Sequence, residues 1–229
     1  MFIKPKKEQS KPKQPKSVKT GTMTPKNLKP NELMTSDEFM RLSRDYVLEH
    51  EKLTILSREY VIENGINWDD DSDIGFDYWG YRVCDLSADE EVLFTGLLYE
   101  LQDDGSLWWY GYYEDGLETE TNVRFYPSGE ICEYSETGTH YQWYESGRIW
   151  KFFFRISATQ YKLYKWYESG LLKEYSFRNK GTTLHDTYEW YENGEIKKYK
   201  SDDGSYCIKC IEYDEAGNIT KCIDKTKNT

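Results

Sequence analysis

The chain has 229 residues, enough for one large or two small domains, with 38% hydrophobic residues, 17% aromatic residues and a net charge of −11. No apolar run approaches the length of a membrane-spanning helix. The sequence lacks a nucleophile elbow, a phosphate loop, an HExxH motif and a dinucleotide fingerprint, so an enzyme is the less favoured class.

The N-terminal segment is rich in Lys and Pro and offers little to bury. Residues 1–31 hold nine lysines against the single acid Glu8. We therefore expect a disordered basic tail over residues 1–33. Such a tail can touch nucleic acid or an anionic membrane, but a solvated extension is favoured because no aromatic residues interleave for base stacking.

The N-terminus has no hydrophobic stretch behind its charges, which argues against a secretory signal. The chain also holds five cysteines, an odd number. Together these features predict reduced thiols and a cytoplasmic location.

Residues 34–92 are expected to form an N-terminal helix, a strand and an acidic segment. Ser36, followed by two acids, is typical of a helix start. Apolar residues then recur at helical spacing, which predicts a helix over 35–50, with a break near His50. The run LTILSREYVI predicts a strand over 53–62.

Acidic residues are concentrated in one zone of the chain. Residues 69–120 hold sixteen acids and one base, Arg82, whereas residues 121–229 hold sixteen of each. One interpretation is solubility, because charge on exposed strands blunts edge-to-edge aggregation. The other is electrostatic attraction of a basic partner. The asymmetry favours the partner slightly, since solubility alone does not require it.

Asp69, Asp71 and Asp73 alternate in this zone and resemble the start of a calcium-binding loop. That motif needs a glycine directly after the third acid and a glutamate at its twelfth position. Ile74 and Gly80 occupy those places. An acidic, solvated loop is therefore favoured over a calcium site, and no metal or other cofactor is predicted.

A repeated turn motif dominates the second half of the chain. WYESG occurs twice, at residues 143–147 and 166–170, and WYENG follows at 190–194. Alignment on the turn glycine gives six units spaced 18 to 24 residues apart, at Gly105, Gly129, Gly147, Gly170, Gly194 and Gly217. A period of this length indicates a stacked array of short supersecondary units.

Within each unit, large rings and aliphatic residues flank the glycine at fixed positions. Rings of this kind favour strands, and a short loop ending in Gly is typical of a type I turn with a bulge. Weaker turns lie midway between the register glycines. The sequence therefore predicts an all-β, elongated antiparallel sheet of stacked β-hairpins over residues 93–224. The Trp and Tyr rows are expected to form mostly its core, with some rings exposed.

Cys207 and Cys210 form a lone CxxC pair. A zinc site needs a second pair or matching histidines, and an offset of three on a regular strand points the two thiols to opposite faces. We interpret them as small buried residues.

The units FYPSGEI, WYESGRI, WYESGLLKEY and WYENGEIKKY resemble the bacterial form of the MORN repeat, as found in YwqK-type antitoxins. The resemblance covers roughly residues 93–222. It implies an array of β-hairpins and an antitoxin or immunity protein that binds its toxin directly. The sequence departs from the pattern at residues 157–160, which lack a turn glycine, and at Asp214, where a tyrosine is usual.

We therefore expect a non-catalytic immunity protein that binds a basic toxin and blocks its functional surface. One form of this hypothesis takes the toxin to be a nuclease. The predicted contact residues are acids of the acidic zone and exposed rings. They are Asp69, Asp70, Asp71, Asp73, Asp89, Glu90, Glu91, Asp103, Asp104, Trp108, Trp109, Trp143, Trp166 and Trp190. Three alternatives stay open: a MORN-type scaffold or membrane-associated protein, a sugar-binding module, and an enzyme built from the first 90 residues.

Overall fold

The computed structural model describes residues 29–51, 53, 55–69, 73–77, 80–87, 92–178 and 184–225. Its main body is a 13-stranded sheet in which β5 to β16 follow one another in chain order. The expected elongated all-β sheet of stacked hairpins is confirmed. Its strands are β5 (Gly96–Leu101), β6 (Leu107–Glu114), β7 (Leu117–Phe125), β8 (Ile131–Glu136), β9 (Thr139–Trp143), β10 (Ile149–Ser157), β11 (Gln160–Trp166), β12 (Leu172–Arg178), β13 (His185–Trp190), β14 (Ile196–Asp202), β15 (Cys207–Tyr213) and β16 (Ile219–Asp224).

A row of mostly aromatic side chains runs across one face of the sheet. From Tyr141 to Tyr199, the centroids of neighbouring rings in the row lie 4.9 to 6.4 Å apart, which is the range of favourable ring pairs. The strand register places the members directly opposite one another: Tyr99, Tyr110, Val123, Tyr134, Tyr141, Phe152, Tyr164, Tyr175, Tyr188, Tyr199, Ile211 and Cys222.

The six register glycines close equivalent turns. Their φ angles lie between +80° and +90°, a region that glycine enters without steric cost. In the unit of Gly147, the glycine N–H donates to Tyr144 O at 2.9 Å, and Tyr144 N donates to Arg148 O at 2.8 Å. The other five units repeat both bonds. The recurring glycines in the sequence therefore mark one turn conformation that is repeated in all six units.

The intervening hairpins are less uniform. Thr137 and Gly138 both have positive φ, as a type I′ turn requires, and they close the short β8–β9 hairpin that accounts for the 18-residue interval. Where the turn glycine is missing, β10 and β11 still pair, with Ser157 opposite Gln160 and a register shift between Arg155 and Ser157. The hairpin thus forms without its glycine.

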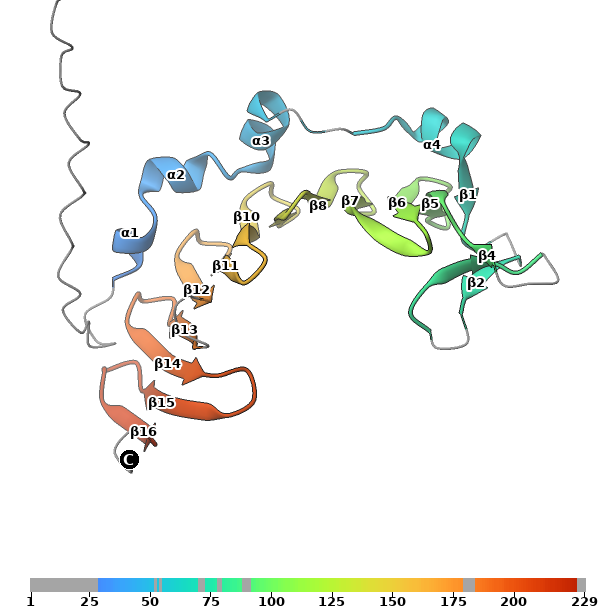
Figure 1. Cartoon of the computed structure of the whole chain (residues 1–229). Helices are drawn as coiled ribbons and strands as arrows, with labels where there is room; N and C mark the ends of the chain where they lie inside the picture. The colour runs from blue at the N-terminus through green and yellow to red at the C-terminus, as the bar shows by residue number, and fades with distance from the viewer. Residues whose placement is uncertain are drawn as a thin grey trace, which may run out of the picture.

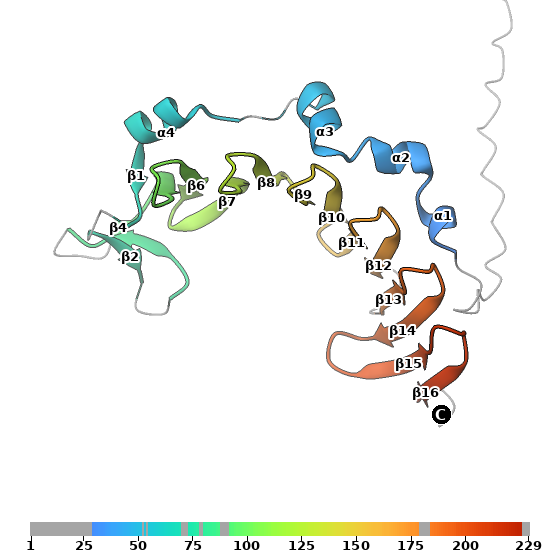
Figure 2. The ribbon, with the colours of Figure 1, turned by 180° about the vertical axis from the view of Figure 1, so that it is seen from behind.

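An N-terminal segment, called the strap here, comprises the described part of residues 29–64. It contains four short helices: α1 (Pro30–Leu33), α2 (Ser36–Met40), α3 (Arg44–His50) and α4 (Arg58–Asn64). Figures 1 and 2 show the sheet bent into an arc, with the strap along its outside. We call the covered side the outer face and the opposite side the inner face. The strap runs in the reverse direction to the array, from β12 back to β5.

The strap corrects three expectations. The helix expected over 35–50 is two helices separated at residues 41–43, because Leu42 O accepts a hydrogen bond from the Trp143 indole and Arg44 N donates to Gly147 O. The strand expected over 53–62 is wrong: α4 begins there, capped by Ser57, whose hydroxyl accepts from Tyr60 N. Residues 30–33, which the sequence assigns to the tail, are helical.

The strap buries its apolar side chains against the rings of the outer face. Val47 and Val61 are fully buried in the same cluster as the ring row. Arg44 anchors the middle of the strap: it forms an ion pair of 3.0 Å with Glu130 and donates to Ile131 O at 3.4 Å. Because the sheet alone leaves its rings uncovered, the strap supplies the second layer of the core.

A small second sheet packs on the inner face at the first hairpin. It consists of β2 (Ile74–Phe76), β3 (Val83–Asp85) and β4 (Val92–Leu93), while β1 (Gly65–Asn67) joins the long sheet parallel to β5. Its buried members Ile74, Val83 and Phe94 form a cluster with Leu98. The array therefore begins at Gly96 rather than at the expected residue 93, since β4 pairs with β3.

Candidate protein-binding surface

The inner face carries a row of mostly polar side chains across the sheet, one position away from the ring row on every strand. Beyond the small sheet, Figure 1 shows this face open on the inside of the arc. In strand order the row contains Glu100, Trp109, Arg124, Glu133, Gln142, Lys151, Lys165, Glu174, Glu189, Lys198, Glu212 and Lys221.

Several neighbours in this row form ion pairs. Lys165 Nζ lies 2.9 Å from Glu174 Oε2, and Lys198 Nζ lies 3.6 Å from Glu212 Oε1. Pairs of this exposure contribute little stability, roughly 0 to 1 kcal/mol each. Their larger effect is to hold long side chains in fixed positions, which leaves a patterned polar surface facing the inside of the arc.

Towards the small sheet, the row contains a more buried polar group. Gln142 donates its side-chain amide to Glu133, and His140 Nε2 lies 3.6 Å from Glu133 Oε1. Burial lowers the pKa of His140 below its usual 6.5 and outweighs the opposing effect of the Glu133 carboxylate. His140 is therefore neutral near pH 7, and its buried Nε2 has no hydrogen-bond partner among the described residues.

The predicted acidic contacts gather at one end of the molecule, called the acidic end here: β1 to β6 and the first part of β7. Asp69 and Asp73 are exposed beside β1 and β2, and Asp103 and Asp104 are exposed in the β5–β6 turn. Hydrogen bonds from Ser106 lower the pKa of Asp104. The remaining predicted acids lie outside the described residues: Asp70, Asp71, Asp89, Glu90 and Glu91.

The predicted tryptophan contacts divide between surface and core. Trp143, Trp166 and Trp190 are core residues, each only 1 or 2% exposed, so they offer no surface to a partner in this conformation. Trp108 is 45% exposed. Trp109 is half-buried under the small sheet and donates its indole N–H to Glu100 Oε2 at 2.7 Å. Trp108 thus remains the accessible ring of the five.

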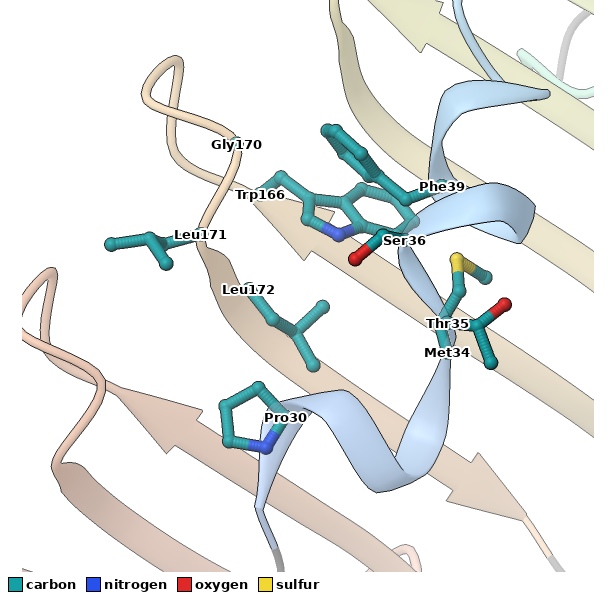
Figure 3. A pocket seen from close by; sticks show the side chains of 9 residues that line it. All are labelled: Pro30, Met34, Thr35, Ser36, Phe39, Trp166, Gly170, Leu171 and Leu172. Atoms are coloured by element: carbon teal, nitrogen blue, oxygen red, sulfur yellow. The ribbon is translucent and has the colours of Figure 1, made fainter.

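An apolar pocket of about 180 Å³ lies on the outer face where the strap begins. Figure 3 shows Pro30 of the strap beside Leu172, and Phe39 beside Trp166. The Phe39 and Trp166 ring centroids are 5.7 Å apart. The pocket is thus a junction between the strap and the array, and it lies on the face opposite to the polar row.

The cysteine pair departs from the expected geometry. Cys210 lies opposite Lys200 and Cys207 opposite Asp202, with a register shift between them. Since Lys200 and Asp202 share a face, the bulge at residue 208 brings both thiols to the inner face. The expectation of opposite faces is therefore wrong. Burial and the Glu212 carboxylate raise the pKa of Cys210, which keeps it a thiol.

Within the described ranges, no group of three or more His, Cys, Asp or Glu side chains is arranged to hold a metal ion. Over the same part of the chain, no helix has both the length and the apolar character needed to cross a membrane. The arrangement provides charge, hydrogen-bonding groups and a curved surface, all of which suit recognition of another molecule.

Sequence reasoning missed the strap as a cover and the inner face as the exposed polar surface. The alternation of ring and polar residues along each strand could have predicted that the inner face is polar. A scan against protein-family models finds no match for this chain, and a search of the curated proteins finds no similar protein.

Proposed function

We propose that the chain is a non-catalytic immunity or antitoxin protein that neutralises a basic protein toxin by binding and occluding it. The observation that carries the proposal is the open inner face of the arc, bounded at one side by the acidic end. Among described residues 69–118, ten acids accompany one base, Arg82. A concave surface beside such a charge imbalance attracts and orients a basic partner.

The mechanism needs no chemistry from this chain. A partner held against the inner face has its own functional surface covered, and a nuclease would lose access to its substrate. The choice of a toxin as the partner comes from the repeat pattern of the sequence. The turn glycines of that pattern close equivalent turns in the sheet.

The test uses, as the toxin candidate, a small basic domain sought among the products of the neighbouring genes. Asp69→Asn with Asp103→Asn removes two exposed charges at the acidic end. Glu145→Gln with Glu192→Gln removes two exposed turn charges elsewhere in the array and serves as the matched control. We expect the first pair to slow association about tenfold at low salt, within the range of electrostatic steering, and the control to have little effect.

Association measured by stopped-flow or biosensor must also slow as salt increases, because salt screens exposed charges. The proposal is wrong if the neighbouring basic domain does not bind. Its electrostatic part is wrong if both double variants behave alike or if salt leaves the rate unchanged.

A further inference from the structure

A pocket of about 170 Å³ opens on the inner face, at the boundary between the acidic end and the balanced part of the array. Glu118 in β7 forms one side, and Phe153 and Arg155 in β10 form the other. Ser135 and His140 lie between them, and the full lining is Glu118, Thr119, Ser135, Gly138, Thr139, His140, Phe153 and Arg155. The pocket thus spans four neighbouring strands.

The chain builds the acidic side of this pocket from a buried amide. Asn122 is 5% exposed, lies opposite Ser135 in the register and donates its side-chain amide to Glu118 Oε1. A Cβ at Gly111 would lie 3.2 Å from Asn122 Nδ2 and 3.4 Å from Glu118 Oε1. Glycine at 111 therefore leaves the room that the Asn122–Glu118 pair occupies.

Hydrogen-bond acceptors predominate at this side. Asn122 Oδ1 is buried and accepts no hydrogen bond from the described residues. A carboxylate accepts up to about four hydrogen bonds, and Asn122 uses one of those of Glu118. The neutral imidazole of His140 and the hydroxyls of Ser135 and Thr139 add further acceptor capacity. A ligand with several donors and a positive charge fits this set.

Glu118 and Arg155 come from strands that are not neighbours in the sheet. β7 and β10 are three strand spacings apart, roughly 14 Å at about 4.8 Å per spacing. The backbone of Arg155 is held beside the β8–β9 turn, because its N–H donates to Gly138 O at 2.7 Å and its Cβ would lie 3.1 Å from a Cβ built on Gly138. The carboxylate of Glu118 and the acceptor of Asn122 therefore lie on the β7 side of the pocket.

We infer that this pocket receives an arginine side chain of a basic protein partner. The guanidinium pairs with Glu118, and the aliphatic stem lies over His140 and Phe153. An arginine has the reach to span part of the pocket and the planar donors that match a carboxylate, whereas a lysine offers a single point charge. The identity of the partner as a basic protein rests on the function proposed above.

The test needs no partner. The isotopically labelled full chain is titrated with N-acetyl-arginine amide and, in parallel, with N-acetyl-citrulline amide, its neutral isostere, and N-acetyl-lysine amide. We expect saturable NMR shifts at the amides of residues 135–140, with the citrulline probe binding at least about tenfold more weakly, as loss of a charged hydrogen-bonded pair implies.

Glu118→Gln removes the pairing charge, and Glu114→Gln removes an equal charge from the same hairpin, outside the pocket lining. We expect the first variant to raise the dissociation constant of the arginine probe about tenfold and the second to change it less than about twofold. Unchanged shifts elsewhere in the spectrum verify that both variants are folded.

Equal effects of the two variants, or shifts located outside residues 118–155, overturn the inference, since they indicate diffuse attraction. Failure of the probe to bind refutes the pocket and leaves the proposed function standing. Failure of the proposed function appears separately, in the association experiment with the toxin candidate.

Discussion

The phenol of Tyr144 donates a hydrogen bond of 2.9 Å to the backbone carbonyl of Trp166, in the next repeat. The same link, at 2.6 to 3.0 Å, joins Tyr126 to Trp143, Tyr167 to Trp190 and Tyr191 to Tyr213. Each turn is thus tied to the following turn in addition to the strand pairing. In the last described unit Asp214 takes this position and accepts hydrogen bonds from its own loop, as suits a terminal unit.

Removing one of these phenol links should weaken the array. We expect Tyr144→Phe to lower the free energy of unfolding by about 1 kcal/mol, because the Trp166 carbonyl loses a donor in a half-buried place. Urea denaturation measures the change. Tyr206→Phe, at a tyrosine that is 71% exposed, is the control. An equal loss in the two variants contradicts a specific role for the link.

The register glycines should be required for their backbone conformation. Gly194 has φ +85°, and no atom lies within 4 Å of a Cβ built there. Gly194→Ala should therefore cost about 1 to 2 kcal/mol through backbone strain alone, and Gly194→Asn should cost less, since Asn tolerates this region better. Thermal or urea unfolding of the two variants gives the comparison, and a stable alanine variant would refute the argument.

Detaching the strap should expose the rings of the outer face. Val47 is 1% exposed, so Val47→Asp places a carboxylate in the core at a cost of several kcal/mol. We expect stronger acrylamide quenching of tryptophan fluorescence and increased binding of a hydrophobic dye. Leu48→Asp is the control, since Leu48 is 37% exposed. Tryptophans that stay protected in the Val47 variant would contradict the covering role.

Alkaline pH should destabilise the fold. Burial raises the pKa of Tyr110, Tyr141 and Tyr188 from 10.0 to about 12. Their contribution to stability is fully present below pH 10, the pKa of an unfolded tyrosine, and is lost as the pH rises towards 12. We expect the urea midpoint to fall over this pH window. The absorbance of the phenolate form should appear at a higher pH than it does for an exposed tyrosine. A midpoint that stays constant from pH 9 to 11 would contradict the burial.

The array was predictable because its signals are local. A turn that needs positive φ selects glycine, and a half-buried strand alternates ring and polar residue, so the period could be counted from the chain. Even the departure at Asp214 leaves the turn intact, with Gly217 N donating to Asp214 O at 2.9 Å.

The strap was not predictable because its conformation depends on distant partners. LTILSREYVI has the composition of a strand, but its described residues pair with no strand, and Leu56 N instead donates to the Tyr110 phenol at 2.8 Å. The candidate surface was predicted only in part. The acidic end followed from charge counting, whereas three of the five tryptophans were taken as contacts because the sequence did not show what covers them.

The reversed course of the strap has a consequence for biosynthesis. Phe39 emerges from the ribosome more than a hundred residues before Trp166, the ring it contacts. The hairpins can form one after another as they emerge, whereas the strap closes much longer loops and cannot finish docking until β12 has emerged. The start of the strap thus waits for a ring that is synthesised long after it.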